Sequence, residues 1–219
     1  MATTEYDSAA PGRSGTRRYH SPRRRMQADQ TREAVLEAAI RLFAERGWAG
    51  TGVRDVARAA AVSVETVYAT FGSKAHLLKS ALEVAVVGDD APVPLADRPA
   101  YTAIATGRTI RERVEATARM IATINERIYR LAGAIRQGAT VDATLAAVRA
   151  DLEGQRRRGI ADIARLITGR DLDPGQLDEL WVQSVDQVYA LLADECGWSR
   201  ARYESWLTDR IEEILDRPV

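Results

Sequence analysis

The chain has few of the residues that support disulfide, catalytic or membrane-spanning roles. Its 219 residues include one cysteine, two histidines and two phenylalanines. The single cysteine, Cys196, excludes an internal disulfide and fits a reducing compartment, so the sequence predicts a cytoplasmic protein. No run approaches the roughly 18 to 20 apolar residues of a membrane span, and no apolar signal segment follows the basic amino end. Neither secretion nor membrane anchoring is expected.

Motifs of enzyme active sites are also missing. The chain has no H-E-x-x-H zinc motif, no glycine-rich phosphate loop and no G-x-S-x-G nucleophile elbow. Its only histidines are His20 and His76, so convergent titratable groups are scarce. Asp89 and Asp90 lack further ligands spaced around them, and a solvated turn explains them more simply than a metal. The sequence therefore predicts no enzyme, no cofactor and no metal.

Strand signals are nearly absent, and amphipathic segments follow one another along the chain. At 46% hydrophobic the chain can bury a sizeable core, and the predicted fold class is all-α. Charge balances overall, with 31 basic and 31 acidic residues. The first 87 residues nevertheless carry 13 basic and nine acidic side chains. This positive amino-terminal part indicates a nucleic-acid partner.

Residues 1 to about 28 are rich in Ser, Thr, Gly, Arg and Pro, with almost no large aliphatic side chains. Such a segment cannot bury enough surface to offset its ordering entropy, so we expect a disordered basic tail over 1–28. Its arginines leave two interpretations open, an arm that follows DNA and a solvated tail. They are Arg13, Arg17, Arg18, and Arg23 to Arg25. The first firm helix is expected from about Thr31 to Arg46.

A pattern of two short helices joined by a tight turn, followed by the start of a third helix, occupies residues 51–74. Thr51 is the expected N-cap of the first helix, whose apolar residues recur at three- and four-residue steps. Ser63 caps the second helix at the N–H of Thr66. Ser73 caps the third. This order of elements predicts a helix-turn-helix that reads DNA.

The outer face of the second short helix is expected to enter the major groove, which is about 12 Å wide. Val67 and Phe71 point inward. Glu65 leaves two interpretations open: it accepts a hydrogen bond from a cytosine N4, or it is solvated and favours the helix dipole. Lys74 lies in the first turn of the third helix, where the ammonium and the helix N-terminus suit a phosphate. The outer residues are Val64, Glu65, Thr66, Tyr68 and Ala69.

The sequence resembles the tetracycline-repressor (TetR) family of transcription regulators over nearly its whole length. The matching segments are T-R-E-A-V-L-E-A-A-I-R-L-F-A-E-R-G-W at 31–48, V-R-D-V-A-R-A-A-A-V-S at 53–63, and T-V-Y-A-T-F-G-S-K at 66–74. Two positions depart from the family pattern. Ala61 stands where the turn commonly has Gly, which strains the turn slightly, and Gly52 stands where Ser or Thr is commoner.

The resemblance implies which residues touch DNA and how the chain is divided. It implies an N-terminal three-helix DNA-binding domain at 29–87, which includes the linking helix from Ser73. A C-terminal helical domain for effector binding and dimerisation follows at 88–219. Phosphate contacts are implied for Thr51, Tyr68 and Lys74, and base-facing positions for Val64, Glu65, Thr66 and Ala69. With Ser63 at the helix start, these are the eight predicted DNA-binding residues.

The last two helices are well marked. Asp173 caps one, with Pro174 at the first helical position and Gln176 closing a capping box; Ser199 caps the other. Their apolar residues exceed what one internal core face needs, so they predict a homodimer through 173–216 as a four-helix interface. The preceding amphipathic segments carry isoleucine-rich stripes. The run Arg156 to Arg158 is interpreted as an exposed face.

These observations predict a homodimeric, ligand-responsive regulator of transcription, acting as a repressor on double-stranded DNA. A two-fold dimer reads two half-sites, so the operator is expected to be palindromic. The effector is an unknown small molecule. Ordinary core packing explains the candidate pocket residues more simply than effector binding does. Two alternatives stay open, an architectural DNA binder without ligand control and an all-α enzyme. The pocket candidates are Trp181, Tyr129, Tyr101 and Tyr189, with Arg136 or Gln137 as polar groups.

Overall fold

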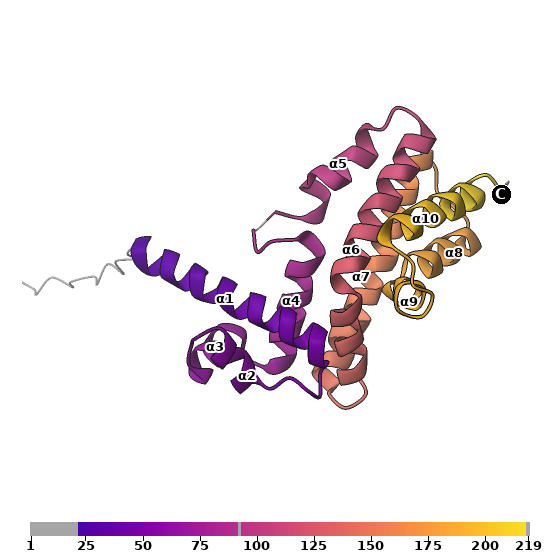
Figure 1. Cartoon of the computed structure of the whole chain (residues 1–219). Helices are drawn as coiled ribbons and strands as arrows, with labels where there is room; N and C mark the ends of the chain where they lie inside the picture. The colour runs from indigo at the N-terminus through magenta and orange to yellow at the C-terminus, as the bar shows by residue number, and fades with distance from the viewer. Residues whose placement is uncertain (1–21, 92, 218–219) are drawn as a thin grey trace, which may run out of the picture.

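The structure, a computed structural model, describes residues 22–91 and 93–217. In this part of the chain, helices and turns are present and strands are absent, so the predicted all-α class is confirmed. Figure 1 shows α1 to α4 at one end of the molecule and the other helices gathered around α6. The elements are α1 (Pro22–Arg46), α2 (Val53–Ala59), α3 (Val64–Phe71), α4 (Lys74–Val87), a 3-10 turn η1 (Leu95–Asp97), α5 (Pro99–Thr106), α6 (Ile110–Gly138), α7 (Ala143–Thr168), α8 (Pro174–Ser184), α9 (Asp186–Ala190), a π-helical turn η2 (Leu191–Glu195) and α10 (Arg200–Leu215).

Helices α1 to α4 surround a core to which α1 contributes the predicted inner stripe. Leu36, Ala39 and Phe43 are buried along this stripe. The same cluster of buried side chains continues into α6 through Leu131 and into α7 through Leu145. The amino-terminal helices are therefore packed on the second part of the molecule rather than tethered to it.

Helix α1 begins at Pro22, well before the predicted start near Thr31. Proline is favourable at the first helical position, and the arginine, methionine, glutamine and alanine that follow it are good helix formers. A helix that has already nucleated extends at little cost, so its exposed first turns need no apolar burial. The expectation of disorder is thus wrong for 22–28. Residues 1–21, with Arg13, Arg17 and Arg18, and the side chains of Arg23 and Arg24 lie outside the described residues.

The turn between α2 and α3 holds a non-glycine residue in the left-handed region. Ala61 has a φ of 55°, and the N–H of Val62 closes the turn by donating to the carbonyl of Ala57 at 2.9 Å. A Cβ atom in this backbone conformation costs about 1 kcal/mol that glycine avoids. The slight strain predicted at Ala61 is present, and the core contacts of α2 and α3 hold the turn against it.

Helix α6 is the central helix of the second part of the molecule. It packs against α4, α5, α7, α9 and α10 (Figure 1). Its apolar residues serve two purposes. Val114 and Leu131 are buried in the core, whereas Ile121 and Ile124 are half-buried and border a cavity.

The predicted caps of α8 and α10 are confirmed. Asp173 accepts hydrogen bonds from the N–H groups of Gly175 at 2.8 Å and Gln176 at 3.1 Å. Ser199 accepts from the N–H of Arg202 at 3.2 Å. These side chains satisfy backbone donors that a helix N-terminus leaves unpaired, which fixes where both helices begin.

The sequence predicts one uninterrupted helix after Asp173, but the chain breaks after Ser184. Val185 is extended, with φ −71° and ψ 148°, and α9 begins at Asp186. The cause is tertiary. Asn125 on α6 donates to the carbonyl of Ser184 at 2.9 Å, and Tyr203 on α10 donates to the carbonyl of Gln183 at 3.2 Å. Both carbonyls thus bond side chains instead of the N–H groups four residues ahead.

Helix α10 uses most of its apolar stripe inside the chain. Tyr203, Leu207 and Ile211 are buried, and the helix packs on α6. The apolar surface that these last helices leave free is therefore smaller than the sequence indicates. Among the described residues around α8 and η2, Val182 is 48% exposed and Leu191 is 60% exposed.

Candidate functional site

The outer face of α3 carries the side chains that were predicted to meet DNA. Val67 and Phe71 are buried and fix this short helix on the core, so the opposite face is held outward. Tyr68 is 48% exposed. Ser63, Glu65 and Ala69 are exposed, and Val64 and Thr66 are half-buried. The predicted α3 residues therefore share one accessible face.

Ser63 organises the start of this face. Its Oγ accepts a hydrogen bond from the N–H of Thr66 at 3.1 Å, and the two hydroxyls lie 3.0 Å apart. The predicted cap is confirmed, and the Thr66 hydroxyl is oriented by the cap before any ligand arrives. The cap thus fixes where α3 begins, and the positive end of its helix dipole suits a phosphate oxygen.

Glu65 lies in the first turn of α3 and is exposed. A hydrogen bond from its own backbone N–H, and a second one from Ser63, lower the pKa of its carboxyl. The side chain therefore stays charged at neutral pH and favours the positive end of the helix dipole. This local role is compatible with a base contact, so both interpretations of Glu65 stay open.

Thr51 does not have the place that was predicted for it. Its side chain is 1% exposed, and its hydroxyl donates to the carbonyl of Leu42 on α1 at 3.0 Å. The N-cap of α2 is Gly52, whose N–H donates to Asp55 at 3.1 Å. The predicted N-cap and phosphate contact of the Thr51 side chain are thus wrong for this structure, because the hydroxyl fastens α2 to α1.

Lys74 is turned toward the protein. Its ammonium donates to the carbonyl of Trp48 at 2.6 Å and lies 3.9 Å from the centre of the Trp48 ring. Burial lowers the pKa of this lysine, although the charge of Asp142 opposes the effect. In this arrangement Lys74 fastens the start of α4 to the end of α1. A phosphate contact requires the side chain to swing away from Trp48.

A second candidate site is a cavity of about 300 Å³ in the second part of the molecule. Side chains of α4, α6, α7, α8 and the α8–α9 break line it. Its walls are mostly aliphatic, with Leu82 and Val86 from α4, Ile124 from α6 and Ile160 from α7. Because α4 begins just after α3 and ends at this cavity, it connects the two sites.

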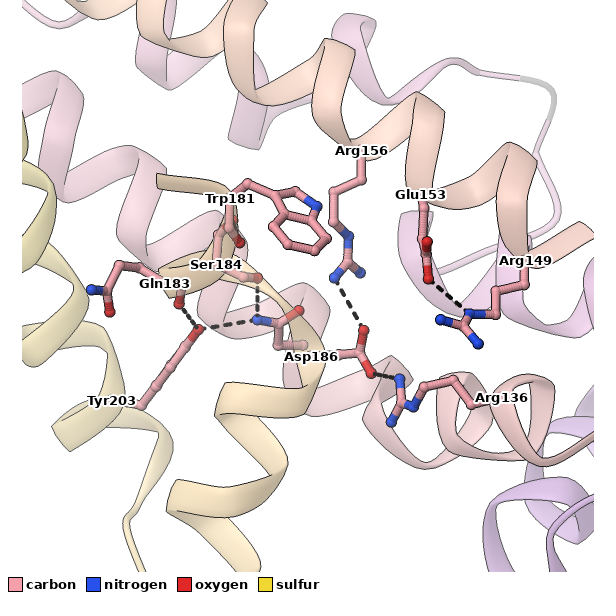
Figure 2. A network of polar contacts seen from close by, with 10 residues as sticks. Arg136, Arg149, Glu153, Arg156, Trp181, Gln183, Ser184, Asp186 and Tyr203 are labelled. Carbon is pink, nitrogen blue, oxygen red and sulfur yellow. Dashed lines mark hydrogen bonds and ion pairs between the residues drawn. The ribbon is translucent and has the colours of Figure 1, made fainter. Parts of the chain in front are cut away.

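The polar wall of the cavity is organised by Asp186, which opens α9. Its side chain is 6% exposed and lies between Arg136 of α6 and Arg156 of α7, whose side chains are 28% and 27% exposed. Arg156 donates to Asp186 at 3.0 Å, and Arg136 donates to its other oxygen. Figure 2 shows this triad with Trp181 beside it. The expectation of an exposed face is wrong for Arg156 and holds for Arg157 and Arg158.

The pocket candidates named from the sequence separate in the structure. Trp181 and Arg136 line the cavity. Tyr189 is buried against Tyr203, with ring centres 5.0 Å apart, and Tyr129 bonds Asp194. Gln137 serves the other site, since it bonds the backbone of Trp48. Tyr101 is also absent from the wall.

Sequence reasoning missed Asp186 and Arg156. The one signal for Asp186 was a charged residue between the apolar residues Val185 and Val188, but its partners lie 30 and 50 positions earlier. Asp89 and Asp90, which were interpreted as a solvated turn, each pair with an arginine, Arg98 and Arg32 respectively. The Arg98 hydrogen bonds lower the pKa of Asp89 to about 2.

A sequence model of the family described as "Bacterial regulatory proteins, tetR family" matches residues 35–81. These residues run from the core of α1 through α2 and α3 into α4. The amino-terminal helices therefore resemble this family over residues 35–81. The eight predicted contact residues all lie within this matched segment.

Curated relatives match part of the chain. The HTH-type transcriptional repressor NicS of Pseudomonas putida is 37% identical over 60 residues, 27% of this chain and 28% of NicS. The HTH-type transcriptional repressor Rv3405c of Mycobacterium tuberculosis is 39% identical over 70 residues, 31% of this chain and 37% of that protein. The matched segment thus spans little more than a third of a curated relative at most.

Solved structures match the fold over most of the chain. A provisionally assigned TetR-family transcriptional regulator from Rhodococcus sp. has a TM-score of 0.65 and 22% identity, covering 86% of this chain and all of that one. The multidrug binding protein EbrR, complexed with imidazole, has a TM-score of 0.56 and 20% identity, covering 86% and 96%. The helical second part therefore has the fold of these proteins.

Within residues 22–91 and 93–217, no helix combines the length and the apolar character that crossing a bilayer requires.

Proposed function

We propose that this protein is a ligand-responsive transcriptional regulator, a repressor, that binds a palindromic DNA operator as a homodimer in the cytoplasm. The observation that carries the proposal is the outer face of α3. A cap at Ser63 and buried anchors at Val67 and Phe71 hold this face outward. The tetR-family match over the same helices supports a DNA ligand.

The proposed contacts fall into two groups. The Tyr68 hydroxyl bonds a phosphate, and Val64, Glu65, Thr66 and Ala69 face the base edges. Thr51 contributes by holding α2 on α1. Lys74 joins the phosphate contacts after release from Trp48.

We place the dimer interface on 173–216. Val182 and Leu191, 48% and 60% exposed, are apolar side chains that a second copy would cover. An isologous pair built this way presents two copies of α3 on one face. Two half-sites about one helical turn apart, roughly 34 to 36 Å, would then be read together.

A route from the cavity to α3 runs through the end of α6. Arg136 lines the cavity, and the next residue, Gln137, accepts hydrogen bonds from the N–H groups of Trp48 at 2.9 Å and Ala49 at 3.3 Å. Lys74 holds the carbonyl of the same tryptophan. A ligand that shifts Arg136 would thus move the segment between α1 and α2. The segment then has two arrangements, one with and one without the shift. The DNA affinity changes by the factor by which the ligand prefers one arrangement over the other.

The cavity favours this function over an architectural DNA binder, which needs no enclosed space between its helices. EbrR, a structural neighbour, is a multidrug binding protein, and this supports a small-molecule role for the corresponding part of the fold. An all-α enzyme has less support, because the cavity wall contains arginines, carboxylates and no histidine or cysteine.

Selection of bound sequences from a random DNA pool tests the proposal. We expect the purified full-length chain to enrich a two-fold symmetric sequence, with half-sites about one helical turn apart. Analytical ultracentrifugation of the complex should give two chains per duplex. Enrichment of no sequence, or of an asymmetric one bound by a single chain, would contradict it.

A further inference from the structure

The polar wall of the cavity has an excess of positive charge. Three arginines and two carboxylates line the cavity, a net charge of +1. Arg149 and Glu153 form one pair at 2.8 Å, which leaves Arg136, Arg156 and Asp186 as the unbalanced group. Two half-buried guanidinium groups share one carboxylate, and a charge without a partner is unfavourable in such a place.

The guanidinium groups of Arg136 and Arg156 both have unused N–H donors. Each donates to Asp186 through Nη1, and neither has another hydrogen bond to a residue in the described part of the chain. A guanidinium carries five N–H donors in one plane, so each can still engage a further acceptor. The unused donors lie on residues that line the cavity.

Trp181 adds an independent observation. Its Nε1 is buried and donates no hydrogen bond within residues 22–91 and 93–217. Figure 2 shows this nitrogen on the edge of the ring that faces Arg156. Buried donors in proteins are nearly always satisfied, so the unpaired indole N–H in this cavity wall is available to an acceptor on a ligand.

The rest of the wall is apolar. Leu82 and Val86 of α4, Ile121 and Ile124 of α6, and Ile160 and Ile163 of α7 contribute aliphatic surface. A volume of about 300 Å³ is at the lower end for small-molecule sites in proteins. The ligand must therefore combine a compact apolar body with one anionic group.

We propose that the cavity binds a small organic carboxylate, with its carboxylate at Arg136, Arg156 and the Trp181 indole and its apolar body among the isoleucines. This inference rests on the proposed function, because it names the chemical class of the effector. The two positive charges of Arg136 and Arg156 balance two negative charges, that of Asp186 and that of the ligand carboxylate. Asp186 holds both arginines in place for the ligand. Displacement of Arg136 by the ligand acts on Gln137, which holds Trp48.

Isothermal titration of the full chain, without DNA, tests the ligand class. The probes are 4-phenylbutanoate, its uncharged amide and 4-phenylbutylammonium, which share one apolar body. We expect the carboxylate to bind at least about tenfold more tightly than the amide, because charge-assisted hydrogen bonds are roughly twice as strong as neutral ones. The ammonium should show no binding.

Two variants of α7 locate the site. Arg156→Gln leaves Arg136 paired with Asp186 and removes the excess charge, so the carboxylate should lose its advantage over the amide. Arg158→Gln removes an exposed arginine two residues away, and this variant should still bind the carboxylate more tightly than the amide. Unchanged thermal midpoints verify that both variants fold. Equal binding of the three probes, binding of none, or an unchanged preference in Arg156→Gln would overturn the inference.

A separate measurement distinguishes this inference from the proposed function. DNA affinity of the wild-type chain is compared with and without saturating 4-phenylbutanoate. Carboxylate binding without any change in DNA affinity leaves the ligand class standing and contradicts ligand control. If DNA affinity responds only to uncharged compounds, the proposed regulatory function stands and the proposed carboxylate ligand is contradicted.

Discussion

Replacing Asp186 by alanine is expected to lower the free energy of unfolding by about 3 kcal/mol. The substitution leaves Arg136 and Arg156 without their shared carboxylate, and removal of one partner from a buried ion pair strands the other charges. Both arginines are more than a quarter exposed, so water compensates in part, and the lower end of the range for buried pairs applies. Urea unfolding followed by circular dichroism measures the loss.

Asp178→Ala is the matched control. Asp178 also pairs with an arginine of α7, Arg157, at 2.6 Å, but its side chain is 65% exposed. Exposed pairs contribute less than about 1 kcal/mol, so this variant should unfold close to wild type. Equal losses in the two variants would contradict a structural role for the triad.

Gly138→Ala is expected to destabilise the protein by about 2 kcal/mol, although alanine is the better helix former. Gly138 is the last residue of α6, where the amino-terminal helices meet α7. A Cβ atom there would lie 2.3 Å from Leu145 and 2.9 Å from the Trp48 ring. Leu145 is fully buried, so it has little room to yield. Urea midpoints of the purified variants measure the change.

Gly133→Ala, on the same helix, is expected to change the stability in the opposite direction. A Cβ atom at Gly133 meets only Arg136, at 3.8 Å. The helix propensity of alanine then acts alone and should stabilise the protein by about 0.5 to 1 kcal/mol. If Gly138→Ala is as stable as Gly133→Ala, the close packing of Trp48 on α6 is refuted.

Local signals in the sequence predicted the local features correctly. Ser63, Asp173 and Ser199 cap helices as expected, because a cap depends on residues within one turn of itself. The inward direction of Val67 and Phe71 follows from helical periodicity in the same way. The exposed face of α3 was therefore accessible to sequence reasoning.

Features that depend on distant partners were not predictable. The break after Ser184 arises from Asn125, 59 positions earlier, and Asp186 meets arginines 30 and 50 positions earlier. The Thr51 hydroxyl donates to a carbonyl of α1, and the Lys74 ammonium donates to the carbonyl of Trp48. In each of these cases the residue bonds a partner that its spacing in the sequence does not reveal.

The most direct test of the central claim compares two substitutions on the outer face of α3. Tyr68→Ala and Glu65→Ala are measured on the selected operator and on a panel with each base of one half-site varied. Tyr68→Ala should weaken every duplex by a similar factor, on the order of tenfold, because a phosphate contact carries no sequence information. Glu65→Ala should change the preference at one base pair if its carboxylate meets a base, and leave it unchanged if the carboxylate serves the helix alone. Wild-type affinity in Tyr68→Ala, together with wild-type preferences in Glu65→Ala, would show that α3 does not meet DNA.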